Sequence, residues 1–325
     1  MEYVFHTPIP LPWLVADTVT ALVSLLVVAF IIRKAKHPVS VILEGFAFVF
    51  LYAGLFENFA VVNGWYVYGR SLLMFGDVPL SVPLIEMDVF LVGLWLLQKM
   101  DVPDWCKPFI LGLFGMLQDF SLDPVAVRQV FTVNGVTSGR WTWLLEPGMA
   151  NILSTIPVYN FPGWMLIMMY ATIYVLLGRR WFRRSGYKPA IGYLYPFIAL
   201  LLAMTTMVTP LSSFLLWLQP FFAKGSQAEW IMLAFHLAFP CLLLLLFWRG
   251  RMKSAVSLTG DLPIFAVAVV FHLMDIGAAL AGGFSEVLPL VVASSVAHIA
   301  LLGLIYYLGR RVKSEPRVDK CFVGP

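Results

Sequence analysis

Residues 109–123 read FILGLFGMLQDFSLD, and Pro124 follows directly. The run begins apolar and then places Asp119 and Asp123 four residues apart. On a helix this spacing puts both carboxylates on one face, one turn apart. Pro124 biases the residue before it away from helical geometry, so we expect the helix to end here. Acids at the end of a membrane segment are costly and usually serve a function, so this stretch is the first candidate for chemistry.

The composition around this stretch is that of a membrane protein. The chain has 325 residues, of which 60% are hydrophobic and 12% are charged, whereas about 25% of the residues of soluble domains are charged. Apolar runs of about 20 residues recur along the chain, each long enough to cross the hydrocarbon core as a helix. We therefore expect an all-α, polytopic transmembrane helical bundle. We expect no cleavable signal peptide, since no basic region precedes the first apolar run.

Nine spans are predicted, most of them bounded by basic residues or by Gly- and Pro-rich loops. They cover residues 13–32, 41–62, 83–97, 109–123, 161–177, 189–210, 230–248, 262–281 and 287–308. The sixth is expected to break near Pro210, and the apolar stretch 211–222 either extends it or lies in the interface. We expect one transmembrane domain over residues 1–313 and a polar cytoplasmic tail over residues 314–325.

The distribution of basic residues predicts the orientation of these spans. If the N-terminus lies outside, only Arg70, Arg128, Arg140 and Lys224 of the 22 lysines and arginines face outward. Lysine and arginine are enriched in cytoplasmic loops, so this arrangement is favoured. It predicts a multi-pass protein of the cell membrane with its C-terminus inside. The formal charge of +4 is spread over short loops, which gives no indication of a nucleic-acid partner.

With this orientation, five acids fall at about one depth, toward the outer leaflet: Glu57, Glu86, Asp88, Asp119 and Asp123. In one interpretation they are ordinary interfacial residues that cap helix ends. In the other they share an acidic pocket. Because like charges held close together in a medium of low dielectric constant cannot all ionise, such a pocket would retain a proton near neutral pH.

Aromatic residues follow these acids in sequence. GWYVYG occupies residues 64–69, GRWTW residues 139–143 and NFPGW residues 160–164. Aromatic faces stabilise cations, although an aromatic belt at the membrane surface needs no function. The candidate substrate-binding residues are Trp65, Tyr66, Tyr68, Trp141, Trp143, Asn160 and Trp164.

In this order and spacing the motifs resemble those of the integral-membrane carotenoid hydratases, a family that includes bisanhydrobacterioruberin and γ-carotene hydratases. The resemblance covers residues 54–164, about a third of the chain, and runs through GLFENFAVVNGWYVYG, DFSLDP, GRWTW and IPVYNFPGW. It implies a carbon–oxygen lyase of carotenoid or isoprenoid biosynthesis that acts on a lipophilic polyene from the bilayer. It also implies a setting among membrane lipids and other membrane enzymes of the carotenoid pathway.

Hydration of a terminal trisubstituted alkene needs an acid that protonates one carbon, stabilisation of the tertiary cation and an ordered water. We expect Asp119, Asp123 and Glu57 to form the catalytic cluster and the aromatic faces to stabilise the cation. This chemistry needs no cofactor and no metal. The alternative function is a proton-coupled transporter, or a lipid- or isoprenoid-binding membrane protein, in which the same acids form a proton site.

Three histidines and three cysteines complete the set of candidate residues. His236, His272 and His298 lie one each on the last three predicted spans, without the paired spacing of a di-iron oxygenase. They are expected to hydrogen-bond between helices, and haem or metal ligation is the alternative. The cysteines, at positions 106, 241 and 321, are scattered and form no CxxC motif, so they indicate neither a disulfide framework nor a zinc site.

Overall fold

The chain is an all-α helical bundle of the multi-pass membrane type. The computed structural model describes residues 9–133, 135–212 and 227–312. Within these ranges nine helical segments are long and apolar enough to cross a membrane. Their helices are α1 (Leu11–Lys34), α2 (Pro38–Ala47) with α3 (Gly54–Val62), α4 (Ser81–Lys99), α5 (Lys107–Ala126), α6 (Asn160–Arg184), α7 (Pro189–Met207), α9 (Gln227–Leu243), α10 (Leu262–Gly282) and α11 (Leu288–Gly309).

All nine predicted spans are confirmed as apolar helices, with shifts at some of their ends. The expected helix end at Asp123 is wrong, since α5 continues to Ala126 with Pro124 inside its last turn. A proline there removes one backbone hydrogen bond, and the helix still closes because the Val127 amide donates to the Asp123 carbonyl at 3.1 Å. The sixth span ends at Met207, before Pro210. Most of residues 211–222 and all of residues 314–325 lie outside the described residues.

The second span is not a uniform α-helix. A π-helical segment, Phe48–Ala53, joins α2 to α3. A π turn is wider than an α turn, so it changes the face that the following residues present, and such turns are frequent at functional sites. Tyr52 within this segment donates a hydrogen bond to the backbone oxygen of Ile167 on α6, at 2.8 Å. The segment therefore fixes the rotation of α3, and with it the direction of Glu57.

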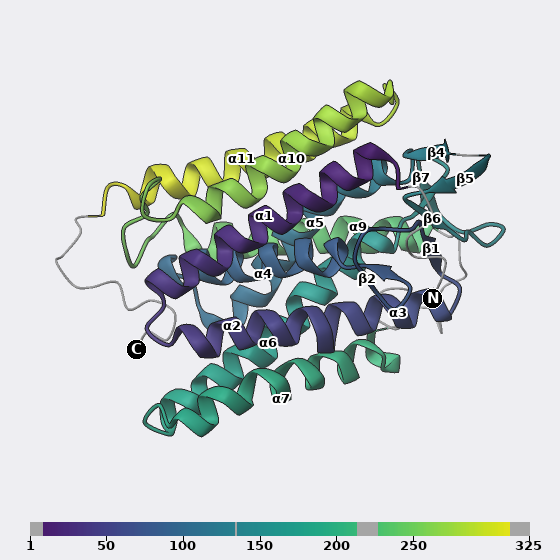
Figure 1. Cartoon of the computed structure of the whole chain (residues 1–325). Coiled ribbons are helices and arrows are strands. Elements are labelled where there is room, and N and C mark those ends of the chain that lie inside the picture. The colour runs from purple at the N-terminus through teal and green to yellow at the C-terminus, as the bar shows by residue number, and fades with distance from the viewer. Residues whose placement is uncertain (1–8, 134, 213–226, 313–325) are drawn as a thin grey trace.

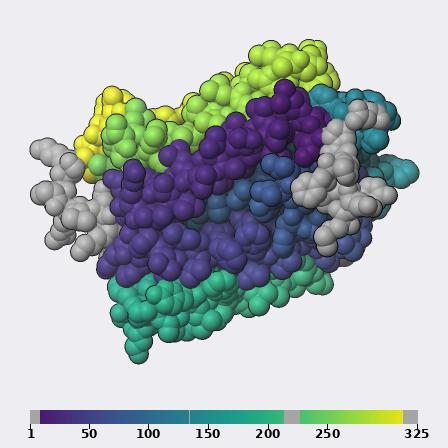
Figure 2. Space-filling model, in the orientation of Figure 1, coloured from purple at the N-terminus to yellow at the C-terminus, as the bar shows by residue number. Residues whose placement is uncertain are grey.

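Two helices, α4 and α5, form the centre of the bundle. Figure 1 shows the helices lying roughly side by side, with α10 and α11 along one edge and α7 along the opposite edge. Nearly nine-tenths of the most apolar stretch of α4 is buried inside the protein, and the same is true of the segment that contains α5. The outer helices expose large apolar side chains such as Leu201 and Leu280, which suit contact with lipid. Figure 2 shows α1 and the second span lying side by side on one such outer face.

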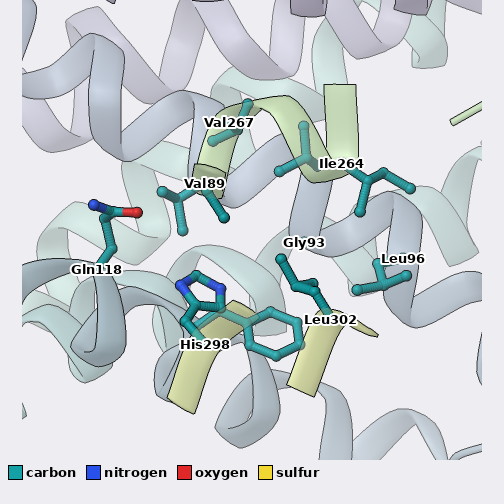
Figure 3. Close-up of a pocket in the computed structure, with 11 residues that line it drawn as sticks. Val89, Gly93, Leu96, Gln118, Ile264, Val267, His298 and Leu302 are labelled. Atoms are coloured by element: carbon teal, nitrogen blue, oxygen red, sulfur yellow. The ribbon is translucent and has the colours of Figure 1, made fainter. Parts of the chain in front are cut away.

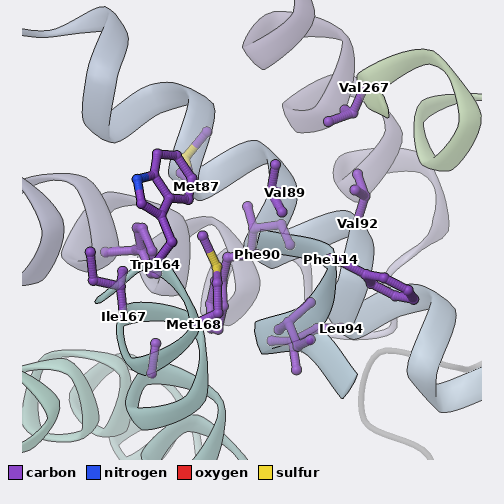
Figure 4. Close-up of a cluster of buried hydrophobic side chains, with 14 of the residues drawn as sticks. Met87, Val89, Phe90, Val92, Leu94, Phe114, Trp164, Ile167, Met168 and Val267 are labelled. Carbon is purple, nitrogen blue, oxygen red and sulfur yellow. The ribbon is translucent and has the colours of Figure 1, made fainter. Parts of the chain in front are cut away.

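The main core is built where the central helices meet α6. Phe90 of α4, Phe114 of α5 and Met168 of α6 are almost completely buried in one cluster. Figure 4 shows Phe90 and Met168 close together, with Trp164 beside Met87. Phe48 of the π-helical segment stacks on Phe90 with ring centroids 4.7 Å apart. This packing holds α4, α5 and α6 in fixed register beneath the site described next.

Short strands cover one end of the bundle (Figure 1). Within the described residues they form four two-stranded antiparallel sheets. The strands are β1 (Tyr66–Tyr68), β2 (Met74–Phe75), β3 (Val78–Pro79), β4 (Val130–Val133), β5 (Val136–Gly139), β6 (Trp141–Trp143), β7 (Asn151–Ile152) and β8 (Ile156–Pro157). They connect helix ends that carry the candidate acids, so the loops and the acids meet at the same end.

Candidate functional site

The pairing of β1 with β6 joins two of the sequence motifs. Tyr66 pairs with Trp143 and Tyr68 with Trp141. Since side chains alternate along a strand, these four aromatic rings share one face of the ribbon. The Tyr66 and Trp143 ring centroids lie 4.6 Å apart. The aromatic ribbon, defined as these four residues, covers the ends of α3 and α5 at the strand-bearing end of the bundle.

A glycine allows the ribbon to close at its end. Gly69 donates its amide hydrogen to the Arg140 carbonyl at 2.8 Å. A Cβ at position 69 would lie closer to the Gly139 carbonyl oxygen and to the Trp13 ring than van der Waals contact allows. The glycine that ends GWYVYG is therefore explained by the close approach of these two chain segments.

Glu57 is held by both tyrosines of the ribbon. The Tyr66 and Tyr68 hydroxyls donate to Glu57 Oε2 at 2.6 and 2.5 Å. Burial, reinforced by the negative charge of Glu57, raises the pKa of both tyrosines well above the usual range. Both phenols therefore stay protonated at physiological pH and remain hydrogen-bond donors. Two donors to one oxygen offset part of the cost of burying this carboxyl group.

Asp119 and Asp123 are bridged by one amide. Nδ2 of Asn160, at the start of α6, donates to Oδ2 of each aspartate at 2.7 Å. Asp123 Oδ2 also accepts a hydrogen bond from the Trp143 indole at 3.1 Å. Asp119 Oδ1, in contrast, is buried and has no hydrogen-bond partner among the described residues. The two aspartates thus share a face, as their spacing predicts, but they differ in how many donors hold them.

Glu86 of α4 belongs to the same cluster. It is fully buried, and neither of its carboxyl oxygens has a hydrogen-bond partner within the described ranges. It lies close enough to Glu57 and Asp119 for their charges to interact. The acid cluster, defined here as Glu57, Glu86, Asp119 and Asp123, therefore draws on three spans. It contains three buried acceptor oxygens without donors, and buried polar atoms of this kind call for an explanation.

Asp88 is separate from this cluster, so the interpretation in which all five acids share one pocket is wrong for this residue. Its carboxyl group faces α1, where Ser24 donates to Oδ2 at 2.8 Å. Two residues along a helix turn the side chain by about 200°, which puts Glu86 and Asp88 on opposite faces. The periodicity of the helix is therefore sufficient to explain why Glu86 and Asp88 face different neighbours.

Two further candidate binding residues pack against apolar groups. Trp65 precedes β1 and packs against Phe56 and Phe59 of α3, with ring centroids 6.1 and 6.0 Å apart. Trp164 lies one turn beyond Asn160 and packs in the core (Figure 4). The structure gathers the remaining candidates: Glu57, Asp119, Asp123, Tyr66, Tyr68, Trp141, Trp143 and Asn160.

The strand-bearing loops are tied to α1 beside the ribbon. Asp17 accepts hydrogen bonds from the Ser71 and Ser81 hydroxyls. Arg140 lies 3.8 Å from the same carboxyl group. Burial lowers the pKa of the Arg140 guanidinium, and the negative charges of Asp17 and Asp275 oppose that shift. These contacts hold the strand-bearing loops over the bundle end.

A second polar cluster lies on another face of α5. The Ser121 hydroxyl is within hydrogen-bond distance of Asp275 Oδ2, at 2.7 Å, and of His272 Nδ1, at 2.8 Å. His272 Nε2 and His298 Nδ1 lie 3.0 Å apart, across α10 and α11. These two histidines therefore hydrogen-bond between helices. Asp275 lies three residues after His272 on the same helix, and Ser121, which joins the two, is the partner that the sequence does not indicate.

A small cavity adjoins this second cluster. It measures about 20 Å³ and lies between α4, α5, α10 and α11. Figure 3 shows Gln118 and His298 at its edge among apolar residues such as Val89 and Leu302. Gln118 Oε1 has no hydrogen-bond partner within the described part of the chain. A volume of this size holds about one water molecule.

Glu44 has a structural partner far from the acid cluster. Its carboxyl group forms a bidentate pair with the Arg179 guanidinium at 2.8 and 2.5 Å. Tyr195 adds a third hydrogen bond at 2.6 Å. All three side chains are buried. The contacts join α2, α6 and α7, which is a helix-packing role.

Comparisons of the chain with models of known protein families, with curated proteins and with solved structures find no match. The function must therefore be argued from the acid cluster and its surroundings.

Proposed function

We propose that this protein is a membrane-embedded enzyme of carotenoid or related isoprenoid biosynthesis that adds water across a terminal carbon–carbon double bond. The observation that carries the proposal is the meeting of the acid cluster with the aromatic ribbon. Carboxyl groups supply and accept protons, and ring faces stabilise a carbocation. A polyene would arrive laterally from the bilayer, in the cell membrane.

The hydrogen bonds assign different roles to the acids. Glu57 and Asp123 each accept hydrogen bonds from two donors, which stabilise negative charge on these oxygens. Asp119 has a single donor and a free Oδ1, so it is the better proton donor. Glu86, with no donors, is a second group suited to hold a proton.

The proposed reaction is balanced within this set. Asp119 protonates the less substituted alkene carbon, which forms a C–H bond and leaves a tertiary cation on the other carbon. Water adds to the cation and forms the C–O bond, while Asp123 takes the proton that this water loses. Transfer of that proton from Asp123 to Asp119 restores the starting state, and the net change is addition of one water.

The test is product analysis with isotopic water. The protein is expressed in cells that make a lycopene-type polyene and that grow in water enriched in ¹⁸O. The pigments are then separated, and their masses are measured by mass spectrometry. The expected result is a hydroxylated polyene that carries ¹⁸O. If the protein accumulates in the membrane and the pigments of several polyene hosts remain unchanged, the proposal is wrong.

A second candidate function is proton-coupled transport. The observation in its favour is the second polar cluster, in which Asp275, Ser121, His272 and His298 form a continuous hydrogen-bonded series inside the bundle. Purified protein in liposomes with an internal pH dye would reveal a substrate-dependent proton flux. Such a flux without any hydroxylated product would favour transport over hydration.

A further inference from the structure

An apolar groove lies between α5, α6 and α9, away from both polar clusters. Its volume is about 340 Å³, within the range of small-molecule sites. Phe109 of α5, Met165 and Met169 of α6, and Phe235 and Phe239 of α9 line it. Figure 1 shows α9 alongside α5 in the bundle. Phe235 is 58% exposed, so the groove opens toward the hydrocarbon of the bilayer.

One side chain in the groove is polar. Among the described residues that line it, His236 alone carries a hydrogen-bonding side chain, and it is 7% exposed. Its Nδ1 lies 2.8 Å from the Met232 carbonyl oxygen, one turn earlier on α9. A carbonyl oxygen can only accept, so Nδ1 carries the hydrogen. In the neutral ring Nε2 is then an acceptor with a free lone pair.

Among the described residues, the contact to the Met232 carbonyl is the one hydrogen bond recorded for His236, and it does not use Nε2. An acceptor left without a donor in an apolar setting costs free energy, and an ionisable residue inside a membrane segment usually marks a functional site. Ligand sites are also usually lined by many apolar groups and a small number of polar ones. The groove therefore fits a hydrocarbon ligand that brings one donor of its own.

We propose that this groove binds a membrane-borne hydrocarbon alcohol, with its chain against the phenylalanines and methionines and its hydroxyl donating to His236 Nε2. The inference does not rest on the proposed hydration, since it uses a different face of the bundle and none of the acid cluster. A phospholipid acyl chain has no hydroxyl there and would leave Nε2 unpaired.

The test compares two probes on the full chain in lipid nanodiscs: farnesol, which has a hydroxyl donor, and its methyl ether, which has none. One neutral hydrogen bond predicts that farnesol binds about twofold to tenfold more tightly than the ether. His236→Phe should abolish this preference while keeping the affinity for the ether. His236→Gln, which retains an acceptor, should keep part of the preference.

A groove-filling variant locates the site. Met169→Trp should weaken the binding of both probes, because the larger ring occupies the space of the chain. Equal binding of farnesol and its ether to the unchanged protein would overturn the role of His236 and leave only a general lipid groove. Farnesol binding that Met169→Trp does not weaken would place the ligand elsewhere and overturn the assignment, as would the absence of farnesol binding.

Discussion

Asn160 donates a hydrogen bond to Asp119 at 2.7 Å, although the two residues are 41 positions apart in the chain. The bond reaches Oδ2 and leaves Oδ1 buried without a donor. One carboxyl group thus combines an anchored oxygen with a free one. That is the arrangement expected of an acid that must stay in place while it passes a proton to a substrate.

The first prediction concerns this acid. Asp119→Asn keeps the shape of the side chain and removes the titrating proton. General acid–base groups contribute a factor of about 10² to 10⁴ in rate, so the hydroxylated product should fall by a factor in that range. The protein should still accumulate in the membrane. The measurement is labelled product per unit of membrane protein.

The matched control is Asp77→Asn, which changes an exposed aspartate in a loop at the same end of the bundle. Its product yield should equal that of the unchanged chain. If Asp119→Asn also hydrates at the full rate, the aspartate pair is a structural helix end. The role of acid would then pass to Glu86.

The second prediction concerns the tyrosines that hold Glu57. Tyr66→Phe or Tyr68→Phe removes one of two donors, whereas the double variant leaves a buried carboxylate with neither. Loss of the last donor to a buried group costs about 1–3 kcal/mol or more. The double variant should therefore lose more stability than the two single variants add up to. Thermal unfolding in detergent measures this, with the exposed Tyr193→Phe as the control.

The third prediction is the pH dependence of the same pair. The folded-state pKa of Tyr66 and Tyr68 lies above that of a free phenol, about 10. The folded state therefore holds these protons more tightly than the unfolded state. Their contribution to stability is complete below about pH 10 and is lost as the pH rises through the raised folded-state pKa. The unfolding temperature should fall less steeply above pH 10 in the double phenylalanine variant. If the unfolding temperature falls equally steeply with pH in the unchanged protein and in the double variant, the prediction is contradicted.

The fourth prediction concerns the buried pair of Glu44 and Arg179. Glu44→Gln leaves the guanidinium buried without its counter-charge, and breaking such a pair costs about 3–5 kcal/mol. The variant should unfold at a clearly lower temperature. Replacement of both residues by methionine should restore much of the stability, because neither charge then remains buried alone. A double variant no more stable than Glu44→Gln would show that the pair itself is required.

The bundle was predictable from the sequence because its signals are local. A membrane helix needs a long apolar run, and each run here carries its own length and flanking charges. The aromatic ribbon depends instead on the register between Tyr66 and Trp143, which lie far apart in the sequence. Hydropathy contains no information on that pairing. The strand period of two could still have shown that Trp65 points away from its neighbour Tyr66.

The partners of the buried acids were equally hidden from the sequence. Glu44 meets Arg179 only because α2 packs beside α6 and α7. The local sequence around either residue does not predict the other as its partner. The membership of Glu86 depends on the rotation of α4, which the packing of Phe90 against Phe48 helps to fix. The sequence predicts that these acids lie at about the same depth in the membrane, whereas side-chain packing determines which of them are in contact.

The last prediction concerns orientation. We expect the N-terminus outside, because this choice places most lysines and arginines in the cytoplasm. α1 and α4 end in basic residues at the same end of the bundle, on the left in Figure 1, opposite the strands. The Lys253 amide donates to the Lys99 carbonyl at 2.7 Å, so the loop after residue 248 lies at that end too. Reporter fusions after Lys36 and after Lys253 should therefore both report the cytoplasm, and a fusion after Gly135 the outside. An external signal after Lys36 and Lys253 would turn the bundle over and place the acid cluster toward the inner leaflet.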